Sequence, residues 1–375
     1  MSKTKIKQSP REPLFHISKR NDVTLTGSIL IHGIGILIAL ILSSLLIILV
    51  TGSKPLDLFK AMYEGVVGTP IANSGINKQY MESIHKMAIL LAISLAVTPA
   101  FKMKFWNIGA EGQVLIGCLV SAFCMLEFGG RIENNALLVI MVLASIVGGA
   151  IWAVIPAICK AFWNTNETLF TLMMNYVAMT LVSYFIMVKD RSGRSDLGII
   201  NERTGFGYLP NLFGRNYMFN IAIILALVVI MFIYLRYSKQ GYEISVVGES
   251  ENTARYIGIN VKKVIIRTVA LSGAICGLVG FMIVAGDKHS INSSIVGGQG
   301  FTAIMVSWMS KFNPLIMIPV SALIIFLSVG SKSATSAFRI DNSVGDILTA
   351  IVIFSIIACE FFTQYKINFR KRKGD

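Results

Sequence analysis

Two long apolar runs enclose a polar segment that reads Ser238-Lys-Gln-Gly-Tyr-Glu-Ile-Ser-Val-Val-Gly-Glu-Ser-Glu-Asn-Thr-Ala-Arg-Tyr-Ile-Gly-Ile-Asn-Val-Lys-Lys-Val-Ile-Ile-Arg267. The enclosing runs are Met218–Tyr237 and Thr268–Gly286, and each is close to the length of a membrane-spanning helix. Within the segment, Ser250 can cap a helix and Gly258 can end it in a left-handed turn. Because so short a helix is marginal alone in water, we expect it to dock on another protein. An ordinary capped loop helix is the alternative.

Composition predicts an all-α integral membrane protein. The chain has 375 residues, of which 54% are hydrophobic and only 14% are charged, whereas soluble domains carry roughly 25% charged residues. We expect about ten transmembrane segments: Gly27–Val50, Lys86–Phe101, Gln113–Leu126, Ala136–Ile158, Leu169–Val188, Met218–Tyr237, Thr268–Gly286, Phe301–Ser310, Pro314–Gly330 and Ile347–Phe362. These segments leave no room for a water-soluble domain of useful size.

The charge pattern predicts how the chain is oriented. Residues 1–26 form a basic segment, 27–363 a single membrane domain, and 364–375 a basic tail. The first apolar run is too long for a signal-peptide core and no cleavage site follows it, so we expect it to stay as a span. With both termini cytoplasmic, most Lys and Arg lie inside. This orientation places Ser238–Arg267 in the cytoplasm and makes Lys189–Asn216 an outer loop.

The net charge of +14 does not point to nucleic acid. Basic ends beside a bilayer are more typical of contact with anionic membrane lipid. The five cysteines lie in or beside apolar spans and form no CxxC pair, and the four histidines have no metal-ligand spacing. The sequence also lacks a P-loop and a GxSxG motif. We therefore expect no metal, no cofactor and no catalytic residues on this chain.

Two glycine-rich motifs carry the most specific signal. They are Phe105-Trp-Asn-Ile-Gly-Ala-Glu-Gly-Gln113 and Ser290-Ile-Asn-Ser-Ser-Ile-Val-Gly-Gly-Gln-Gly-Phe301. Each precedes a predicted span that is too short, namely Gln113–Leu126 and Phe301–Ser310. Short, glycine-interrupted spans at matching places in two halves are typical of a transporter's binding site. Two glycine-rich turns at the membrane surface are the alternative.

The two motifs also align with each other. Ile108-Gly-Ala-Glu-Gly-Gln113 matches Val296-Gly-Gly-Gln-Gly-Phe301, and the predicted topology has the first motif enter its span from inside and the second from outside. This predicts an inverted repeat that relates spans two to five to spans seven to ten.

Three motifs in order resemble the permease subunits of ABC importers in the ribose/nucleoside and branched-chain amino acid group. Trp106-Asn-Ile-Gly-Ala-Glu-Gly-Gln-Val-Leu-Ile-Gly117 is similar to the signature of that group. Its nucleoside branch resembles this chain at Asn166-Glu-Thr-Leu-Phe-Thr-Leu-Met-Met-Asn-Tyr-Val177 and at Gly248-Glu-Ser-Glu-Asn-Thr-Ala-Arg-Tyr-Ile-Gly-Ile-Asn-Val-Lys262. The long basic N-terminus is similar to the larger permease of the usual pair. Trp106 and Phe170 depart from the residues expected in many relatives, which bears on the cargo.

The resemblance implies partners and a location. It implies ABC ATPase subunits that bind ATP on the cytoplasmic side, a second permease that is a paralogue, and an extracellular substrate-binding lipoprotein. It also implies a multi-pass protein of the bacterial plasma membrane with nucleosides as cargo. Ribose or another simple sugar is the alternative cargo.

Two sets of residues are predicted to act in transport. The substrate pathway is expected to use Trp106, Asn107, Glu111, Gln113, Asn175, Asn292, Ser293, Gln299 and Phe301. Coupling to the ATPase is expected to use Glu249, Ser250, Glu251, Ala254, Arg255, Tyr256 and Gly258, with the small Ala254 close to the partner.

Several of these residues have structural alternatives. Trp106 and Phe301 can stack a base or simply pack, Glu111 can face cargo or bond the backbone of the short helix, and Asn175 can face the pathway or a neighbouring helix. A different class of protein, an ion-coupled carrier, needs charged groups deep in its spans. In this sequence only Glu111 is deep, which disfavours a carrier.

Overall fold

The computed structural model describes residues 15–19, 25–52, 54–68, 78–190, 193–210, 212 and 217–369. Its elements are β1 (Phe15–Lys19), α1 (Leu25–Thr51), α2 (Pro55–Val67), α3 (Lys78–Lys102), α4 (Ala110–Phe128), α5 (Asn134–Trp163), α6 (Glu167–Lys189), α7 (Met218–Tyr237), α8 (Lys239–Glu249), α9 (Glu251–Tyr256), α10 (Val261–Ile283), η1 (Val284–Lys288), α11 (Gln299–Met309), α12 (Pro314–Ala337), α13 (Asn342–Gln364) and β2 (Tyr365–Phe369). The chain divides into two compact units, Tyr63–Val329 and a unit built from both chain ends, Met1–Met62 with Gly330–Asp375.

The structure confirms a helical membrane protein. Among the described residues, seven helices are long and apolar enough to cross a bilayer, or eight if the bent pair Leu37–Val50 and Pro55–Val67 counts as one span. The predicted number of ten spans and the inverted repeat therefore stay predictions. Parts of the predicted outer loop (191–192, 211 and 213–216), most of the basic N-terminal segment and residues 370–375 lie outside the described residues.

One expected short span was wrong. Gln113–Leu126 belongs to α4, which has 19 residues because it starts at Ala110, inside the first glycine motif, and continues to Phe128. The other segment is short, as expected, since α11 has only 11 residues; that it counts as a span stays a prediction. The asymmetry arises because Gly112 of the first motif lies within α4, whereas Gly297 and Gly298 before α11 are left-handed, with φ of +64° and +77°.

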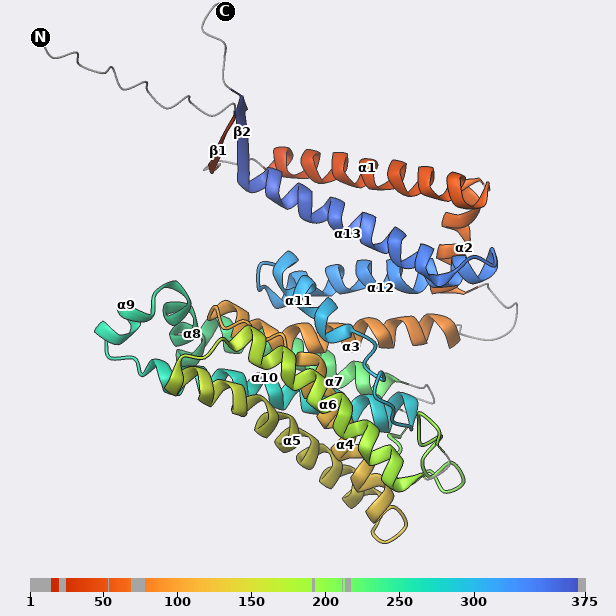
Figure 1. Ribbon diagram of the computed structural model, residues 1–375, viewed down its shortest axis with the longest axis vertical. Helices are drawn as coiled ribbons and strands as arrows, with labels where there is room; N and C mark the ends of the chain where they lie inside the picture. Colours follow the sequence, from red (N-terminus) through yellow and green to blue (C-terminus); the bar gives the residue numbers. More distant parts are fainter. Residues whose placement is uncertain are drawn as a thin grey trace, which may run out of the picture. The chain divides into compact units, whose positions relative to one another are not determined.

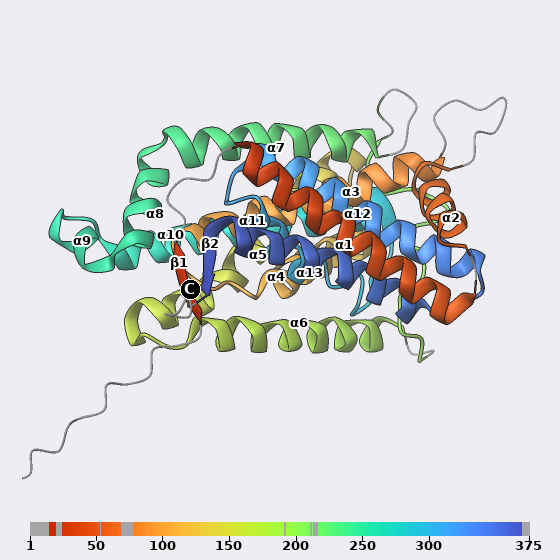
Figure 2. The same ribbon diagram turned by 90° about the horizontal axis from the view of Figure 1, so that it is seen from above.

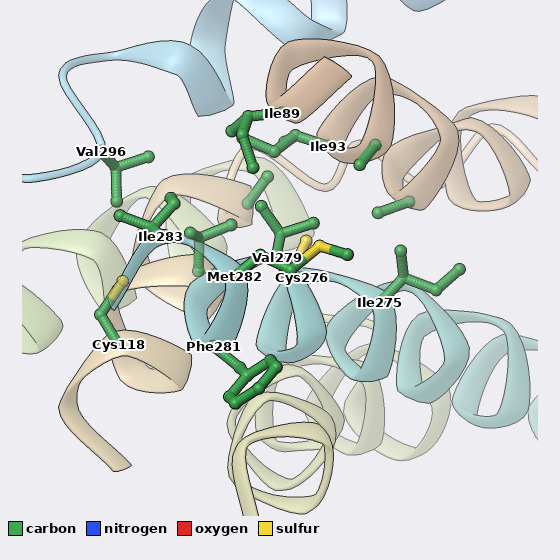
Figure 3. Close-up of a cluster of buried hydrophobic side chains, with 14 of the residues drawn as sticks. Ile89, Ile93, Cys118, Ile275, Cys276, Val279, Phe281, Met282, Ile283 and Val296 are labelled. Atoms are coloured by element: carbon green, nitrogen blue, oxygen red, sulfur yellow. The ribbon is translucent and has the colours of Figure 1, made fainter. Parts of the chain in front are cut away.

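The core of the Tyr63–Val329 unit forms around α10. Gly277 of α10 lies against the backbone of Ser145 in α5, and a Cβ placed on Gly117 of α4 would stand 2.6 Å from the Gly277 carbonyl oxygen. Small residues let membrane helices approach this closely, and the resulting van der Waals contact holds them together. Larger side chains of α10, including Val279, Met282 and Ile283, point into the surrounding cluster, as Figure 3 shows.

The outer helices of this unit bury only a stripe. α7 buries residues spaced three or four apart, which is one helix face: Asn220, Ile224, Val228, Met231 and Leu235. Its exposed side carries Leu225, Val229, Ile230 and Ile233. Exposed apolar side chains on a long helix suit lipid rather than water.

Polar loops lie at both ends of this unit. Figures 1 and 2 both place α8 and α9 at one end of the unit and the loop after α6 at the other. Residues of this loop pack onto the segment after α10, with Leu197 donating its backbone N–H to the Ile291 carbonyl and Ile200 to that of His289. The polar loops therefore gather at opposite ends of the helices, as a membrane domain requires.

The unit built from the chain ends pairs α1 with α13. Gly35 of α1 lies directly against Cys359 of α13, where a side chain would not fit. The strands β1 and β2 pair antiparallel, with Phe15 opposite Phe369 and Lys19 opposite Tyr365. This short sheet was not predicted, because both strands lie in segments that were interpreted only by their charge.

Candidate functional site

The first glycine motif is held in place by buried amide side chains. Gln113 donates to Asn107 Oδ1 over 3.1 Å, and Asn107 Nδ2 donates to the Ser272 hydroxyl of α10, also over 3.1 Å. Asn107 Oδ1 also accepts from the backbone N–H of Gly109. Asn107 and Gln113 are almost fully buried. Since a buried polar group must be hydrogen-bonded, these two predicted pathway residues frame the turn between α3 and α4.

Asn175 of α6 completes this frame. It accepts from the backbone N–H of Gly112 at 2.8 Å and donates to the carbonyl of Ile108 at 3.0 Å. A Cβ on Gly112 would stand 2.8 Å from Asn175 Oδ1, so glycine is what permits this contact. Of the two alternatives for Asn175, the structure has it bond a neighbouring element.

Glu111 joins the two glycine motifs directly. Its carboxylate accepts from the backbone N–H of Gly298 at 2.8 Å and from that of Gly300 at 2.7 Å. Both amides belong to the start of α11, and a carboxylate there satisfies donors that lack a partner within the helix and matches the positive end of its dipole. The structure therefore has Glu111 bond the backbone of the short helix, which was one of its two predicted alternatives.

The second motif places its residues in two settings, the start of α11 and the loop before it. Gln299 opens α11 and its Oε1 is buried without a hydrogen-bond partner in the described part of the chain. Asn292 and Ser293 lie earlier, in the loop before α11, where Asn292 forms an isolated bridge with Asp196. A cavity of about 450 Å³ opens there between Asn292, Asp196 and Lys288. The structure thus separates Gln299 from Asn292, although the sequence presents them as one motif.

Aromatic side chains of both motifs are partly exposed. Trp106, which precedes the buried Asn107 in the chain, is 43% exposed, and Phe301 is 40% exposed. Trp308 of α11 is 49% exposed and lies with its ring centroid 5.2 Å from that of Trp106. Phe301 and Trp308 share a face of α11, because seven residues are close to two helical turns. Sequence reasoning missed Trp308, and its spacing of seven from Phe301 was the signal.

Another buried cluster was also missed. His85 of α3 and Asn220 of α7 meet at 2.9 Å, and His85 Nδ1 lies 4.0 Å from the Asp287 carboxylate in η1. His85 also stacks on Tyr217, with ring centroids 4.5 Å apart. These residues are far apart in the sequence, so only the packing of α3, α7 and α10 brings them together.

The polar loop between α7 and α10 contains two helices where the sequence suggested one. Ser238 caps α8 by accepting from Gly241 N at 2.9 Å, and Ser250 caps α9 by accepting from Thr253 N at 3.2 Å. Gly258 follows α9 with φ of +85°, as expected for its left-handed turn. An ion pair between Arg267 of α10 and Glu243 of α8, at 2.9 Å, fixes the first helix.

The predicted coupling residues divide into exposed and buried groups. Tyr256 is 93% exposed, and Glu249, Glu251 and Arg255 are also exposed. Ala254 has no exposed surface and belongs to an apolar cluster with residues such as Phe105 and Ile244. The expectation that Ala254 lies against a partner needs correction, because it already packs inside its own chain. The small size of Ala254 serves the docking of α9 onto α8 and α10.

The comparisons with known proteins agree with this arrangement. Residues 80–357 match the family model described as "Branched-chain amino acid transport system / permease component". The glucose ABC transporter permease protein TsgB13 of Haloferax volcanii is 28% identical over 335 residues, which cover 86% of each chain. The guanosine ABC transporter permease protein NupP of Bacillus subtilis is 28% identical, over 90% of this chain and 96% of the relative.

A third relative aligns over a similar share of both chains. The nucleoside ABC transporter permease protein NupB of Lactococcus lactis is 24% identical, over 90% of this chain and 93% of the relative. A permease subunit is a multi-pass transport component without catalytic activity of its own, and ATP is bound by a separate ATPase. Because the family model covers most of the chain, this protein belongs to the branched-chain amino acid transport system permease family and is a permease subunit of an ABC importer.

Proposed function

We propose that this chain is the membrane permease of an ATP-driven nucleoside importer. In this proposal it crosses the plasma membrane of a bacterium ten times, with both termini and the loop containing α8 and α9 in the cytoplasm. An ATPase contacts that loop, a second and paralogous permease completes the pathway, and an extracellular lipoprotein delivers the cargo. The excess of Lys and Arg on the assigned inner side supports this orientation.

One observation carries the proposed pathway: the two glycine motifs meet at Glu111. The motifs that align in sequence each open a helix, α4 at Ala110 and α11 at Gln299. The carboxylate of Glu111 links the start of one helix to the start of the other. Opposed helix starts formed from irregular glycine backbone are typical of transporter sites at membrane depth. This meeting point supports the proposed inverted repeat and a pathway beside it.

The cargo assignment rests on the exposed aromatic side chains. Phe301 near the start of α11, and Trp308 near its end with Trp106 beside it, offer exposed flat apolar surfaces, and aromatic rings stack on any nucleobase. The guanosine and nucleoside names of two relatives support the same cargo. Under this proposal the buried amides shape the wall, and the aromatic side chains contact the base.

A sugar is the second candidate cargo. The glucose permease of Haloferax volcanii is as similar to this chain as the guanosine permease of Bacillus subtilis, at 28% identity. Tryptophan faces also suit the apolar face of a sugar ring. Cargo must therefore be decided by measurement, and the two candidates make opposite predictions.

Uptake by cells that express the complete importer tests the cargo. Radiolabelled uridine or guanosine should accumulate, and an excess of unlabelled nucleoside should abolish the accumulation while glucose and ribose leave it unchanged. Accumulation of labelled glucose that nucleosides do not inhibit would establish the sugar reading instead.

A substitution on α11 tests the aromatic contact. Trp308→Leu should raise the KM for nucleoside about tenfold, because stacking on a base contributes ~1–3 kcal/mol. Trp163→Leu is the matched control, since Trp163 is an exposed tryptophan at the end of α5. Equal KM values for the two variants would remove Trp308 from the pathway.

A further inference from the structure

A cavity of about 370 Å³ lies at the end of the membrane helices that also carries α8. Its walls come from four places in the Tyr63–Val329 unit: the end of α3, the end of α7, the first half of α8 and the turn before α12. Its lining residues are Lys102, Phe232, Leu235, Arg236, Gly241, Tyr242, Ser245, Phe312, Asn313 and Pro314. The cavity is separate from the meeting point of the two glycine motifs.

The polar part of this lining is positively charged. It contains Lys102 and Arg236, and no acidic residue is among the lining residues. Within the described part of the chain, neither cation has an ion-pair partner; Glu243, the neighbour of Tyr242, is held by Arg267 at 2.9 Å. Two cations that line one cavity without a counter-charge repel each other, so an anion bound in that cavity would be stabilised.

The position of the cavity indicates the chemistry of that anion. Lys102 is the last residue of α3 and Arg236 is next to last in α7, so both stand where spans end. Phe232 and Leu235 extend the lining back along α7 toward the apolar part of the membrane. Tyr242 is 61% exposed, as is common for aromatic residues at a membrane interface. A ligand here would meet cations and hydrogen-bond donors at one end and apolar side chains at the other.

We propose that this cavity binds the phosphate headgroup of an anionic phospholipid. Lys102 and Arg236 contact the phosphate, and the acyl chains lie along Phe232 and the exposed side of α7. Basic pockets between membrane helices are suited to such headgroups. Because α8 and the turn before α12 share the cavity, the lipid ties the polar loop to the membrane helices.

Native mass spectrometry of the purified full-length chain in its complex tests this site. The sample is incubated with phosphatidylglycerol or with phosphatidylcholine of the same acyl chains, and retained lipid is measured. Phosphatidylglycerol should be retained preferentially. The double variant Lys102→Gln/Arg236→Gln should bind it about 30-fold more weakly, since each basic residue near a membrane surface contributes about fivefold.

Two matched variants distinguish a loss of lipid binding from misfolding of the protein. Lys104→Gln/Lys239→Gln removes two exposed cations that lie outside the cavity lining, one just after α3 and one at the start of α8. This variant should retain lipid like the unchanged protein. Lys102→Arg/Arg236→Lys conserves both charges and should also retain it. Loss of lipid in the conservative variant together with a lowered Tm would mean that the positions are structural, which overturns the proposal.

Other outcomes also decide the matter. Equal retention of both lipids, or equal loss in the control variant, would overturn the assignment. Competition by inorganic phosphate at the same concentration as the lipid would show an anion site rather than a lipid site. The measurement needs no nucleoside, ATP or transport, so its failure would leave the proposed importer function untouched.

Discussion

The Glu111 carboxylate connects the two glycine motifs by hydrogen bonds. It is a carboxylate in a membrane domain, almost fully buried, and both of its oxygens accept from backbone amides of α11. A charged side chain at this depth is costly unless it is satisfied. Its hydrogen bonds explain how the chain keeps it, and they make α11 depend on α4.

Removing this carboxylate should destabilise the protein. Glu111→Ala leaves the amides of Gly298 and Gly300 without acceptors, which costs about 1–3 kcal/mol for each buried group. The Tm of the purified complex should fall, and Glu111→Gln, which keeps one acceptor oxygen, should lower it less. Glu127→Gln, at the exposed far end of α4 where Glu127 pairs with Lys189, is the control and should change the Tm little. A Tm for Glu111→Ala equal to that of the control would contradict the assigned role.

At the residue scale, the sequence singled out the two glycine motifs but could not show which hydrogen bonds their side chains make. The motif around Glu111 was found because Gly, Asn and Gln are unusual in front of an apolar span. The roles depended on partners in other helices: Ser272 for Asn107, and the Gly298 and Gly300 amides for Glu111. Spacing within one motif carries no information about such partners, so the sequence could not show that four of the predicted pathway residues are buried and hydrogen-bonded to neighbouring elements: Asn107, Glu111, Gln113 and Asn175. Their part in the pathway stays a prediction.

At the scale of elements, α10 organises the Tyr63–Val329 unit. Gly277 lies against the carbonyl oxygen of Ser145 in α5, with no space for a side chain. Gly277→Ala should push α10 away from α5 and cost about 1–3 kcal/mol, as overpacking of a tight core does. Gly148→Ala is the control, because its Cβ would meet side-chain rather than backbone atoms, namely Val120 Cγ2 at 2.9 Å and Ile116 Cγ2 at 3.8 Å.

Thermal unfolding in a single detergent measures the difference between these two alanine variants. A lower Tm is expected for Gly277→Ala alone. If both variants unfold at the temperature of the unchanged protein, backbone contact between α10 and α5 is not what holds the unit together.

The α9 helix offers an exposed face for a partner. Tyr256→Ala should reduce the amount of ATPase that co-purifies with the chain, while the Tm of the chain stays unchanged because Tyr256 is 93% exposed. Ala254→Trp should instead lower the Tm, since Ala254 is buried in its own chain. Tyr184→Ala, an exposed tyrosine in the middle of α6, is the control for ATPase content. If the Tyr256→Ala variant co-purifies with as much ATPase as the unchanged chain, the contact must lie elsewhere on the loop.

Caps and left-handed turns in this loop were predictable, whereas the number of helices was not. Ser250 and Gly258 act as expected because capping depends on local chemistry. The α8 helix was missed because its apolar residues, such as Ile244 and Val247, become a helix face only when packed against the chain. The length of α4 was missed for the related reason that Asn175 stabilises its glycine-rich first turn from another helix.

For the whole molecule, the orientation in the membrane can be tested directly. Thr204 is exposed in the loop after α6 and Asn252 is exposed in α9, at opposite ends of the Tyr63–Val329 unit. In a cysteine-free background that still assembles, Thr204→Cys should react from outside with an impermeant maleimide, and Asn252→Cys only after lysis. Labelling of Asn252→Cys in intact cells would reverse the proposed orientation.

The overall class of the molecule was the most predictable feature of all. Hydropathy defines membrane helices because every backbone polar group must be satisfied within lipid, and the predicted run Met218–Tyr237 coincides with α7. The count of ten spans is harder to establish, because α11 is short and α13 is interrupted by polar residues near its start. Such elements are recognised by their packing, which composition does not report.

The most direct test of the account is transport by the complete complex, purified through this chain and reconstituted in proteoliposomes. Nucleoside supplied with the binding protein should accumulate only when ATP reaches the ATPase, and the Trp308→Leu variant should need about tenfold more nucleoside for the same rate. Glucose should not accumulate. Nucleoside accumulation that proceeds without ATP, or ATP-driven accumulation of glucose in place of nucleoside, would contradict the account.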